Sequence, residues 1–220
     1  MSAAGSSGYG RAARLRARRP WWQRLLALIG IQTVSARQAE ALATRAEIGA
    51  AAEQATAVLL APLTGRGWWI GHDRALPRSR ANLDHILVSP CGTAVVVLDT
   101  KRWHRGWPTR LVNGRVHCGN RDRQDDVDKV AAYTARVGRA LGLPGVAVWP
   151  LLVVHGSPLA GGSLEARAKG WPGPVYLVSA ERLVATLASA PKTLADPARA
   201  AALAAIVNDL FPPYIEGSRP

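Results

Sequence analysis

The spacing of apolar residues predicts a long helix near the start of the chain. Residues 35–60 are rich in alanine, contain no proline and begin with the Ser-x-x-Gln spacing of a helix-capping box at Ser35. Apolar residues that face a protein core recur every three or four positions along a helix. We therefore expect the buried side of this helix to be formed by Ile48, Ala52, Ala55 and Leu59.

Three segments after this helix have the composition of β-strands. They cover residues 67–76, 83–89 and 93–100, and all contain β-branched or aromatic residues. The third is an almost unbroken apolar run, which is typical of a strand covered on both faces. Because only Pro90-Cys91-Gly92 separates the second strand from the third, we expect the two to form an antiparallel hairpin.

The second half of the chain predicts a further hairpin, helices and two more strands. The hairpin turns at Asn113-Gly114, and residues 124–141 have the periodicity of an amphipathic helix that ends at Gly142. The remaining expected elements are strands at 146–154 and 175–178, a Gly/Pro-rich loop at 156–174, and helices that begin at Ala180 and at Asp196-Pro197. The main order is thus α-β-β-β-α-β. It predicts an α/β (α+β) fold in which helices flank a central mixed sheet.

Composition limits the class of protein. The chain has 220 residues, of which 48% are hydrophobic, so it can bury a sizeable core. Its two cysteines, Cys91 and Cys118, are too few for a disulfide framework or a four-thiolate zinc site, and we expect both thiols to be free. The longest apolar run, Leu25–Ile31, is shorter than the roughly 20 residues of a membrane-spanning helix. We therefore expect a cytoplasmic protein.

The positive charge divides the chain into parts. The formal net charge is +13, and residues 1–34 contribute +6 of it through six arginines with no acidic residue. We interpret 1–34 as a basic arm whose first ten residues are disordered, 35–212 as the folded domain, and 213–220 as a tail. A chain this basic favours a polyanionic partner, either nucleic acid or an anionic membrane surface.

The Trp21–Ile31 segment within the arm allows three interpretations. It is a short helix packed on the domain, part of an arm that neutralises phosphates, or an interfacial anchor whose tryptophans lie at headgroup depth. The anchor would hold the protein at the inner face of the membrane.

Candidate chemistry lies at the end of the third strand. Asp99 and Lys101 project from the same face of that strand because side chains alternate with a period of two. If the turn centres near Cys91-Gly92, Asp84 of the second strand lies almost opposite Asp99. Two carboxylates so close repel each other unless a cation lies between them, and an oxygen-only site favours Mg²⁺ or Mn²⁺.

Lys101 would complete such a site. It is placed to orient or deprotonate an attacking water, or to stabilise charge on a phosphate. The plainer alternative is a structural ion pair between an acid and a lysine at a sheet edge. His85 should point to the face opposite Asp84, so we interpret it as a structural residue.

Several short motifs surround the candidate site. They are Gly49-x-x-x-Glu53, Asp84-His-Ile-Leu-Val, Pro90-Cys-Gly92, Asp99-Thr-Lys101-Arg-Trp103 and Gly119-Asn-Arg-Asp-Arg-Gln124. Together they resemble the nuclease-related domain (NERD) family of the PD-(D/E)xK nuclease-like superfamily. The resemblance covers roughly residues 46–212 and implies a restriction-endonuclease-like core. It further implies that Asp84 and Asp99 bind metal, that Lys101 is the catalytic lysine, and that Glu53 is an acid that holds a second metal or its water. Gln124 resembles a site residue more weakly.

Basic and aromatic residues follow the candidate site. Arg102, Arg105 and Arg110 are candidates for phosphate contacts, while Trp103 and Trp107 would either stack on bases or pack in the core. Since no base-reading motif is present, we expect a Mg²⁺- or Mn²⁺-dependent nuclease that acts on DNA with low sequence specificity. The alternative is a nucleic-acid-binding module that keeps the nuclease-like fold without its activity.

Overall fold

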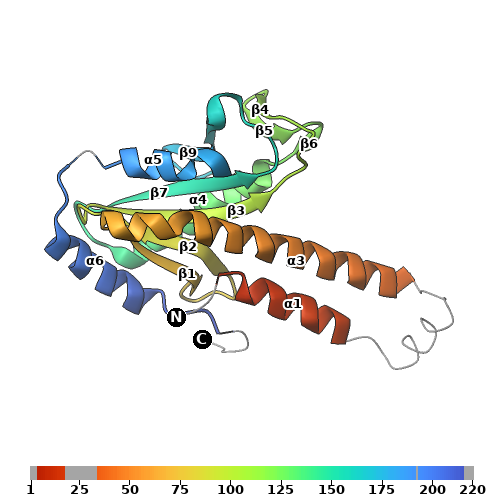
Figure 1. Ribbon diagram of the computed structural model, residues 1–220, viewed down its shortest axis with the longest axis horizontal. Helices are drawn as coiled ribbons and strands as arrows, with labels where there is room; N and C mark the ends of the chain where they lie inside the picture. Colours follow the sequence, from red (N-terminus) through yellow and green to blue (C-terminus); the bar gives the residue numbers. More distant parts are fainter. Residues whose placement is uncertain (1–3, 18–33, 192, 216–220) are drawn as a thin grey trace.

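A computed structural model describes residues 4–17, 34–191 and 193–215 of the chain (Figure 1). Its centre is a six-stranded sheet with the strand order β1-β2-β3-β7-β9-β8. The strands are β1 (Trp69–Ala75), β2 (Asn82–Val88), β3 (Ala94–Arg102), β7 (Ala147–His155), β8 (Ser163–Arg167) and β9 (Pro174–Ser179). Strands β1, β2 and β3 are antiparallel, whereas β7 runs parallel to both β3 and β9. The sheet is therefore mixed, and the predicted fold class is confirmed.

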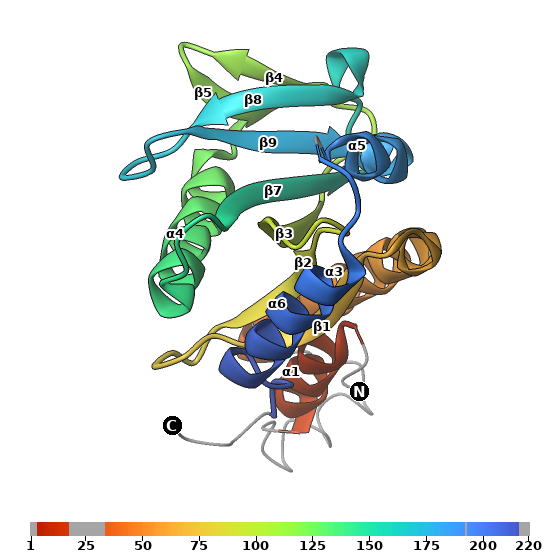
Figure 2. The ribbon, with the colours of Figure 1, turned by 90° about the vertical axis from the view of Figure 1, so that its left-hand side faces the viewer.

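Helices cover both faces of this sheet (Figure 2). The helices are α1 (Ser6–Ala17), α3 (Val34–Leu60), α4 (Gln124–Leu141), α5 (Leu183–Ser189) and α6 (Pro197–Leu210), with 3-10 turns at Ala61–Arg66, Ala160–Gly162 and Ala180–Arg182. On one face, α4 and α6 share a buried cluster with alternate residues of β3 such as Val95 and Val97. On the other, α3 and α5 share a second cluster with Val96 and Leu98. This alternation explains the apolar run of β3, which is buried from both sides.

A small second sheet lies between β3 and α4 in the chain. It consists of β4 (Thr109–Val112), β5 (Arg115–Cys118) and β6 (Arg121–Asp122), and its first two strands form the hairpin predicted at Asn113-Gly114. Figure 1 shows it beyond the end of β3, close to the start of α4. This sheet therefore borders the end of the strand that carries Asp99 and Lys101.

The prediction of an irregular loop over 156–174 was wrong in part, because β8 lies within it. This strand pairs with β9 at the edge of the sheet and buries only Ala166 of its five residues. A short edge strand with so few buried positions has too weak an apolar alternation to be recognised from the sequence.

The prediction of a disordered N-terminus was also wrong for residues 6–10, which belong to α1. This helix packs along α3 through small residues: Ala12 is 1% exposed and Ala43 of α3 is fully buried. A Cβ atom added at Gly8 would lie 2.9 Å from the Cβ of Ala50. The Gly/Ser/Ala composition, which we interpreted as a sign of disorder, instead allows the two helices to approach closely.

The packing of α1 also corrects the predicted buried side of α3. Ala52 is buried and Leu59 half-buried, but Ile48 and Ala55 are exposed. The reason is that α3 lies between two partners. It presents Ala50 to Gly8 of α1, and its other buried residues are Ala36, Ala43, Ala52, Thr56 and Leu60.

Asp73 of β1 fixes the start of α1 to the sheet. Its carboxylate accepts hydrogen bonds from Ser6 Oγ at 2.5 Å, from the backbone N–H of Ser7 at 3.0 Å and from Asn82 Nδ2 at 2.7 Å. The side chain is 1% exposed. A carboxylate at this end of a helix is also stabilised by the helix dipole.

No helix in the described ranges is both long and apolar enough to span a membrane. The Trp21–Ile31 segment lies outside the described residues, so its three interpretations remain predictions.

We predict that Asp73→Ala lowers the free energy of unfolding by about 1–3 kcal/mol, because Ser7 and Asn82 lose a buried hydrogen-bond acceptor. Trypsin should then cut more rapidly at Arg11 and Arg14 of α1. Chemical denaturation and timed proteolysis measure the two effects, with Asp209→Ala on the exposed side of α6 as the control. Equal stability and equal cleavage in both variants would contradict the role of Asp73.

Candidate active site

Two carboxylates meet where β2 and β3 run side by side. The register pairs His85 with Leu98, which places Asp84 opposite Asp99 as predicted. The backbone N–H of Thr100 donates a 2.8 Å hydrogen bond to Asp84 Oδ2. Asp99 is only 4% exposed, so its charge requires partners within the protein.

Two lysines supply those partners. Lys101, on the same face of β3, forms an ion pair with Asp99 Oδ2, as its spacing predicts. Lys129 Nζ of α4 lies 3.4 Å from Asp99 Oδ1. Lys129 was not among the predicted site residues, because the polar side of an amphipathic helix such as 124–141 usually faces solvent. A signal was present in Asp126 and Lys129, which are three positions apart and share a helix side.

The surrounding charges keep Lys101 protonated. Burial alone would lower the pKa of the Lys101 ammonium, but the negative charges of Asp99 and Asp84 outweigh it, and the pKa rises above its usual range. Asp126 of α4 contributes in the same direction. Of the three roles predicted for Lys101, orienting a water and stabilising charge on a phosphate suit a protonated amine, whereas deprotonating a water does not.

Asp84 and Glu53 resist ionisation. Burial, and then the negative charge of Asp99, raise the pKa of Asp84 to about 6. Burial also raises the pKa of Glu53 on α3 to about 8, with further contributions from Asp84, Asp73 and Asp99. Within the described ranges no side chain donates a hydrogen bond to the Glu53 carboxylate, although the charge of Lys101 acts to lower its pKa. The carboxyl groups of Asp84, Asp99 and Glu53 thus outnumber the two lysines, and protonation of the buried acids compensates for the shortage of positive charge.

This donor set fits a hard divalent cation with few protein ligands. No group of three or more His, Cys, Asp or Glu side chains within residues 4–17, 34–191 and 193–215 could hold a metal ion. Magnesium commonly binds through only one or two carboxylates and completes its shell with water and phosphate oxygens. Asp84 and Asp99 match that requirement, and a cation bound there would compete with Lys101 and Lys129 for Asp99.

The other predicted site residues lie at different depths. Arg102, Arg105 and Arg110 are exposed at or after the end of β3. Trp103 is 4% exposed and packs in the core, so it cannot stack on a base. Trp107 is 36% exposed.

Gln124 has a structural role in this arrangement. Its Oε1 accepts a hydrogen bond from the backbone of Val116, and its Nε2 donates to Asp128 Oδ1 and to the carbonyl of Arg167. Since Gln124 is also buried, we assign it to the junction of α4, β5 and β8 rather than to a ligand.

His85 has the structural role predicted for it. His85 is fully buried and its Nδ1 lies 2.8 Å from Nδ1 of His72 on β1. Burial lowers the pKa of both rings. His85 is thus neutral, and it lies on the sheet face opposite Asp84.

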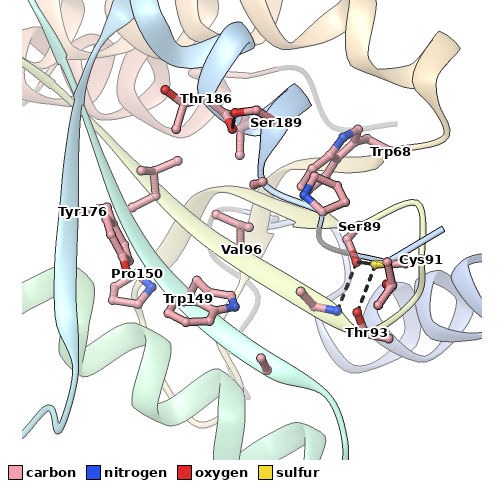
Figure 3. A pocket seen from close by; sticks show the side chains of 17 residues that line it. Trp68, Ser89, Cys91, Thr93, Val96, Trp149, Pro150, Tyr176, Thr186 and Ser189 are labelled. Atoms are coloured by element: carbon pink, nitrogen blue, oxygen red, sulfur yellow. Dashed lines mark hydrogen bonds between the residues drawn. The ribbon is translucent and has the colours of Figure 1, made fainter. Parts of the chain in front are cut away.

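A separate cavity of about 640 Å³ lies over the other end of β3 (Figure 3). Its lining is mostly apolar and includes Trp68, Trp149 and Tyr176. Cys91 lines one side, and both predicted free thiols are confirmed. Burial raises the pKa of the Cys91 thiol, but hydrogen bonds with Ser89, Thr93 and Thr193 outweigh it and lower the pKa to about 6. None of the predicted site residues lines this cavity.

Comparison with known proteins assigns the central part of the chain to a family. Residues 48–155 match the nuclease-related domain family, whereas searches of curated proteins and of solved structures found no match. The match runs from α3 through β7 and so includes Glu53, Asp84, Asp99 and Lys101. It ends before β8, β9, α5 and α6, although the resemblance in the sequence extends to about residue 212. The chain therefore belongs, through residues 48–155, to the nuclease-related domain (NERD) family.

Proposed function

We propose that this protein is a metal-dependent nuclease that hydrolyses phosphodiester bonds in DNA with low sequence specificity. The proposal depends above all on one observation: Asp84 and Asp99 lie opposite each other with Lys101 on Asp99, within a nuclease-related domain. Carboxylates and a cation so placed are suited to holding a divalent metal and a phosphate in one site. The net charge of +13 supplies affinity for nucleic acid without reading its sequence.

Asp84 and Asp99 are the proposed ligands of Mg²⁺ or Mn²⁺. When bound, the cation supplies positive charge for the phosphate oxygens. Lys101 remains protonated and stabilises charge that develops on the phosphate. Lys129 holds the second oxygen of Asp99 and so fixes the orientation of that carboxylate.

Glu53 is the proposed proton-transfer group. Its pKa of about 8 lies close to neutral pH, so both its protonated and ionised forms are populated there. A carboxylate in this state can take a proton from a water beside the phosphate and release it later. An Asp or Glu with an ordinary pKa is a much weaker base at the same pH.

We predict that Asp99→Asn and Lys101→Met each lower Mg²⁺-dependent cleavage of plasmid and single-stranded DNA by at least about 100-fold. Asp99→Asn loses a proposed metal ligand, and Lys101→Met loses the charge beside the phosphate. The control is Asp209→Asn, which removes an exposed carboxylate of α6. Thermal melts establish that each variant is folded. Cleavage at wild-type rates by either site variant would remove that residue from the mechanism.

We predict that Mn²⁺ affinity, measured by calorimetry, falls as the solution is acidified. With a pKa of about 6, Asp84 is ionised at pH 7 but protonated at pH 5. Below pH 6 a proton competes with the metal, and the association constant should drop about tenfold per pH unit. Asp84→Asn should show weak binding at both pH values. A wild-type affinity that is equal at pH 5 and pH 7 would exclude Asp84 as a ligand.

We predict that Glu53→Gln stabilises the fold in neutral and alkaline solution. Because the folded-state pKa of Glu53 is raised from 4.5 to about 8, the wild-type protein loses stability as pH rises through this window. Glutamine lacks the ionisation, so the melting temperature of the variant should exceed that of the wild type by a few degrees at pH 8 and by little at pH 4.5. The exposed Glu165→Gln serves as the control. Identical pH profiles for Glu53→Gln and wild type would contradict the unfavourable burial of Glu53.

A nucleic-acid-binding module without catalysis is the second candidate. It is favoured by the pairing of both Asp99 oxygens with lysines, which neutralises the carboxylate without a metal. This candidate predicts salt-sensitive DNA binding with no cleavage in Mg²⁺ or Mn²⁺, and equal Mn²⁺ binding by wild type and Asp84→Asn. The cleavage and calorimetry experiments above therefore separate the two functions.

A further inference from the structure

An exposed group of aromatic and cationic side chains lies just beyond β3. The rings of His104 and Trp107 are stacked with centroids 4.6 Å apart and planes 33° apart. The guanidinium of Arg121, from β6, lies 5.4 Å from the centroid of Trp107. His104 and Arg121 are exposed, and Trp107 is 36% exposed. We call these three residues the Trp107 cluster.

The protein holds this cluster in place through its own backbone. The carbonyl of Trp107 accepts a 2.5 Å hydrogen bond from Ser157 Oγ, and its N–H donates to the carbonyl of His104 at 3.1 Å. Gly119 has a φ of +58°, and a Cβ atom there would lie 3.0 Å from the Trp107 ring. The aromatic surface is thus formed before any ligand binds, which reduces the entropy lost on binding.

The cluster is close to the carboxylate site. Trp107 is only six positions after Lys101, so their Cα atoms are at most ~22 Å apart. Exposed Arg102 and Arg105 lie on the connecting chain. The nearby acid Asp122 is neutralised by an ion pair with Arg115 of β5. A strand held at Lys101 can therefore reach the cluster along a positively charged path.

We infer that the Trp107 cluster binds the bases of a single-stranded segment of nucleic acid next to the candidate active site. Aromatic and guanidinium groups stack on unpaired bases of any sequence, and neighbouring arginines hold the phosphates. In a duplex the faces of the bases are covered by their neighbours, so the cluster distinguishes single strands and frayed ends from intact duplex. This inference rests on the proposed function in placing the strand at Asp84 and Asp99, but base stacking itself requires no catalysis.

The experiment compares Trp107→Ala with Trp149→Ala in the full chain. Trp149 is 41% exposed and lines the apolar cavity over the other end of β3 (Figure 3), so it is a tryptophan of similar exposure away from the cluster. Binding of a fluorescent 12-nucleotide oligothymidine and of a matched duplex is measured by anisotropy, without divalent metal, over a salt series. Thermal melts establish folding.

We expect Trp107→Ala to weaken oligothymidine binding about tenfold, in line with the loss of one stacked base, and duplex binding less than twofold. The salt dependence should be unchanged because no phosphate contact is lost. Trp149→Ala should bind as the wild type does. Equal oligothymidine affinity in the two variants, or equal weakening for single strand and duplex, would overturn the inference.

Two further measurements separate this inference from the proposed function. If the wild type cleaves no DNA but Trp107→Ala still loses single-strand affinity, the nuclease proposal fails and the cluster stands. If the wild type cleaves single-stranded DNA and Trp107→Ala binds and cleaves it normally, the cluster fails and the nuclease proposal stands. A matched loss of oligouridine binding would support stacking on bases as the interaction, since both DNA and RNA present it.

Discussion

The compensation of the buried Asp99 charge connects the main parts of this molecule. Asp99 is at the end of a strand covered on both faces, where an isolated carboxylate would be strongly disfavoured. Its ion pairs with Lys101 and Lys129 join β3 to α4, and the register of the hairpin brings Asp84 beside it. The fold therefore maintains a concentration of charge that a purely structural sheet edge does not require.

The balance of that charge is the basis of the functional proposal. Lys101 and Lys129 face four acidic side chains, Asp84, Asp99, Glu53 and the half-buried Asp126. Burial raises the pKa of Asp84, Glu53 and Asp126. A site with excess carboxylate inside a strongly basic protein attracts phosphate from a distance and favours a cation close by. In the proposed function the basic surface and the acidic site have complementary roles, since the first attracts nucleic acid and the second acts on it.

Much of this site could be predicted from local sequence, because strand alternation and a short turn determine which residues meet. Asp84, Asp99 and Lys101 follow from the Pro90-Cys91-Gly92 turn and the period of two. Lys129, the burial of Trp103 and the internal hydrogen bonds of Gln124 depend on how α4 and the small sheet pack, which no local pattern encodes. The same limit applies to α1: its glycines and alanines are also typical of disordered segments, and only the facing alanines of α3 give them a helical partner.

The central claim is that Asp84 and Asp99 together bind a divalent cation. The most direct measurement is anomalous diffraction from crystals soaked in Mn²⁺ at pH 7, where Asp84 is ionised. We expect one strong peak between the two carboxylates, with oxygen ligands at about 2.1 Å and with the Lys101 ammonium displaced from Asp99. Crystals without a peak, in which Lys101 and Lys129 still pair with Asp99, would contradict it.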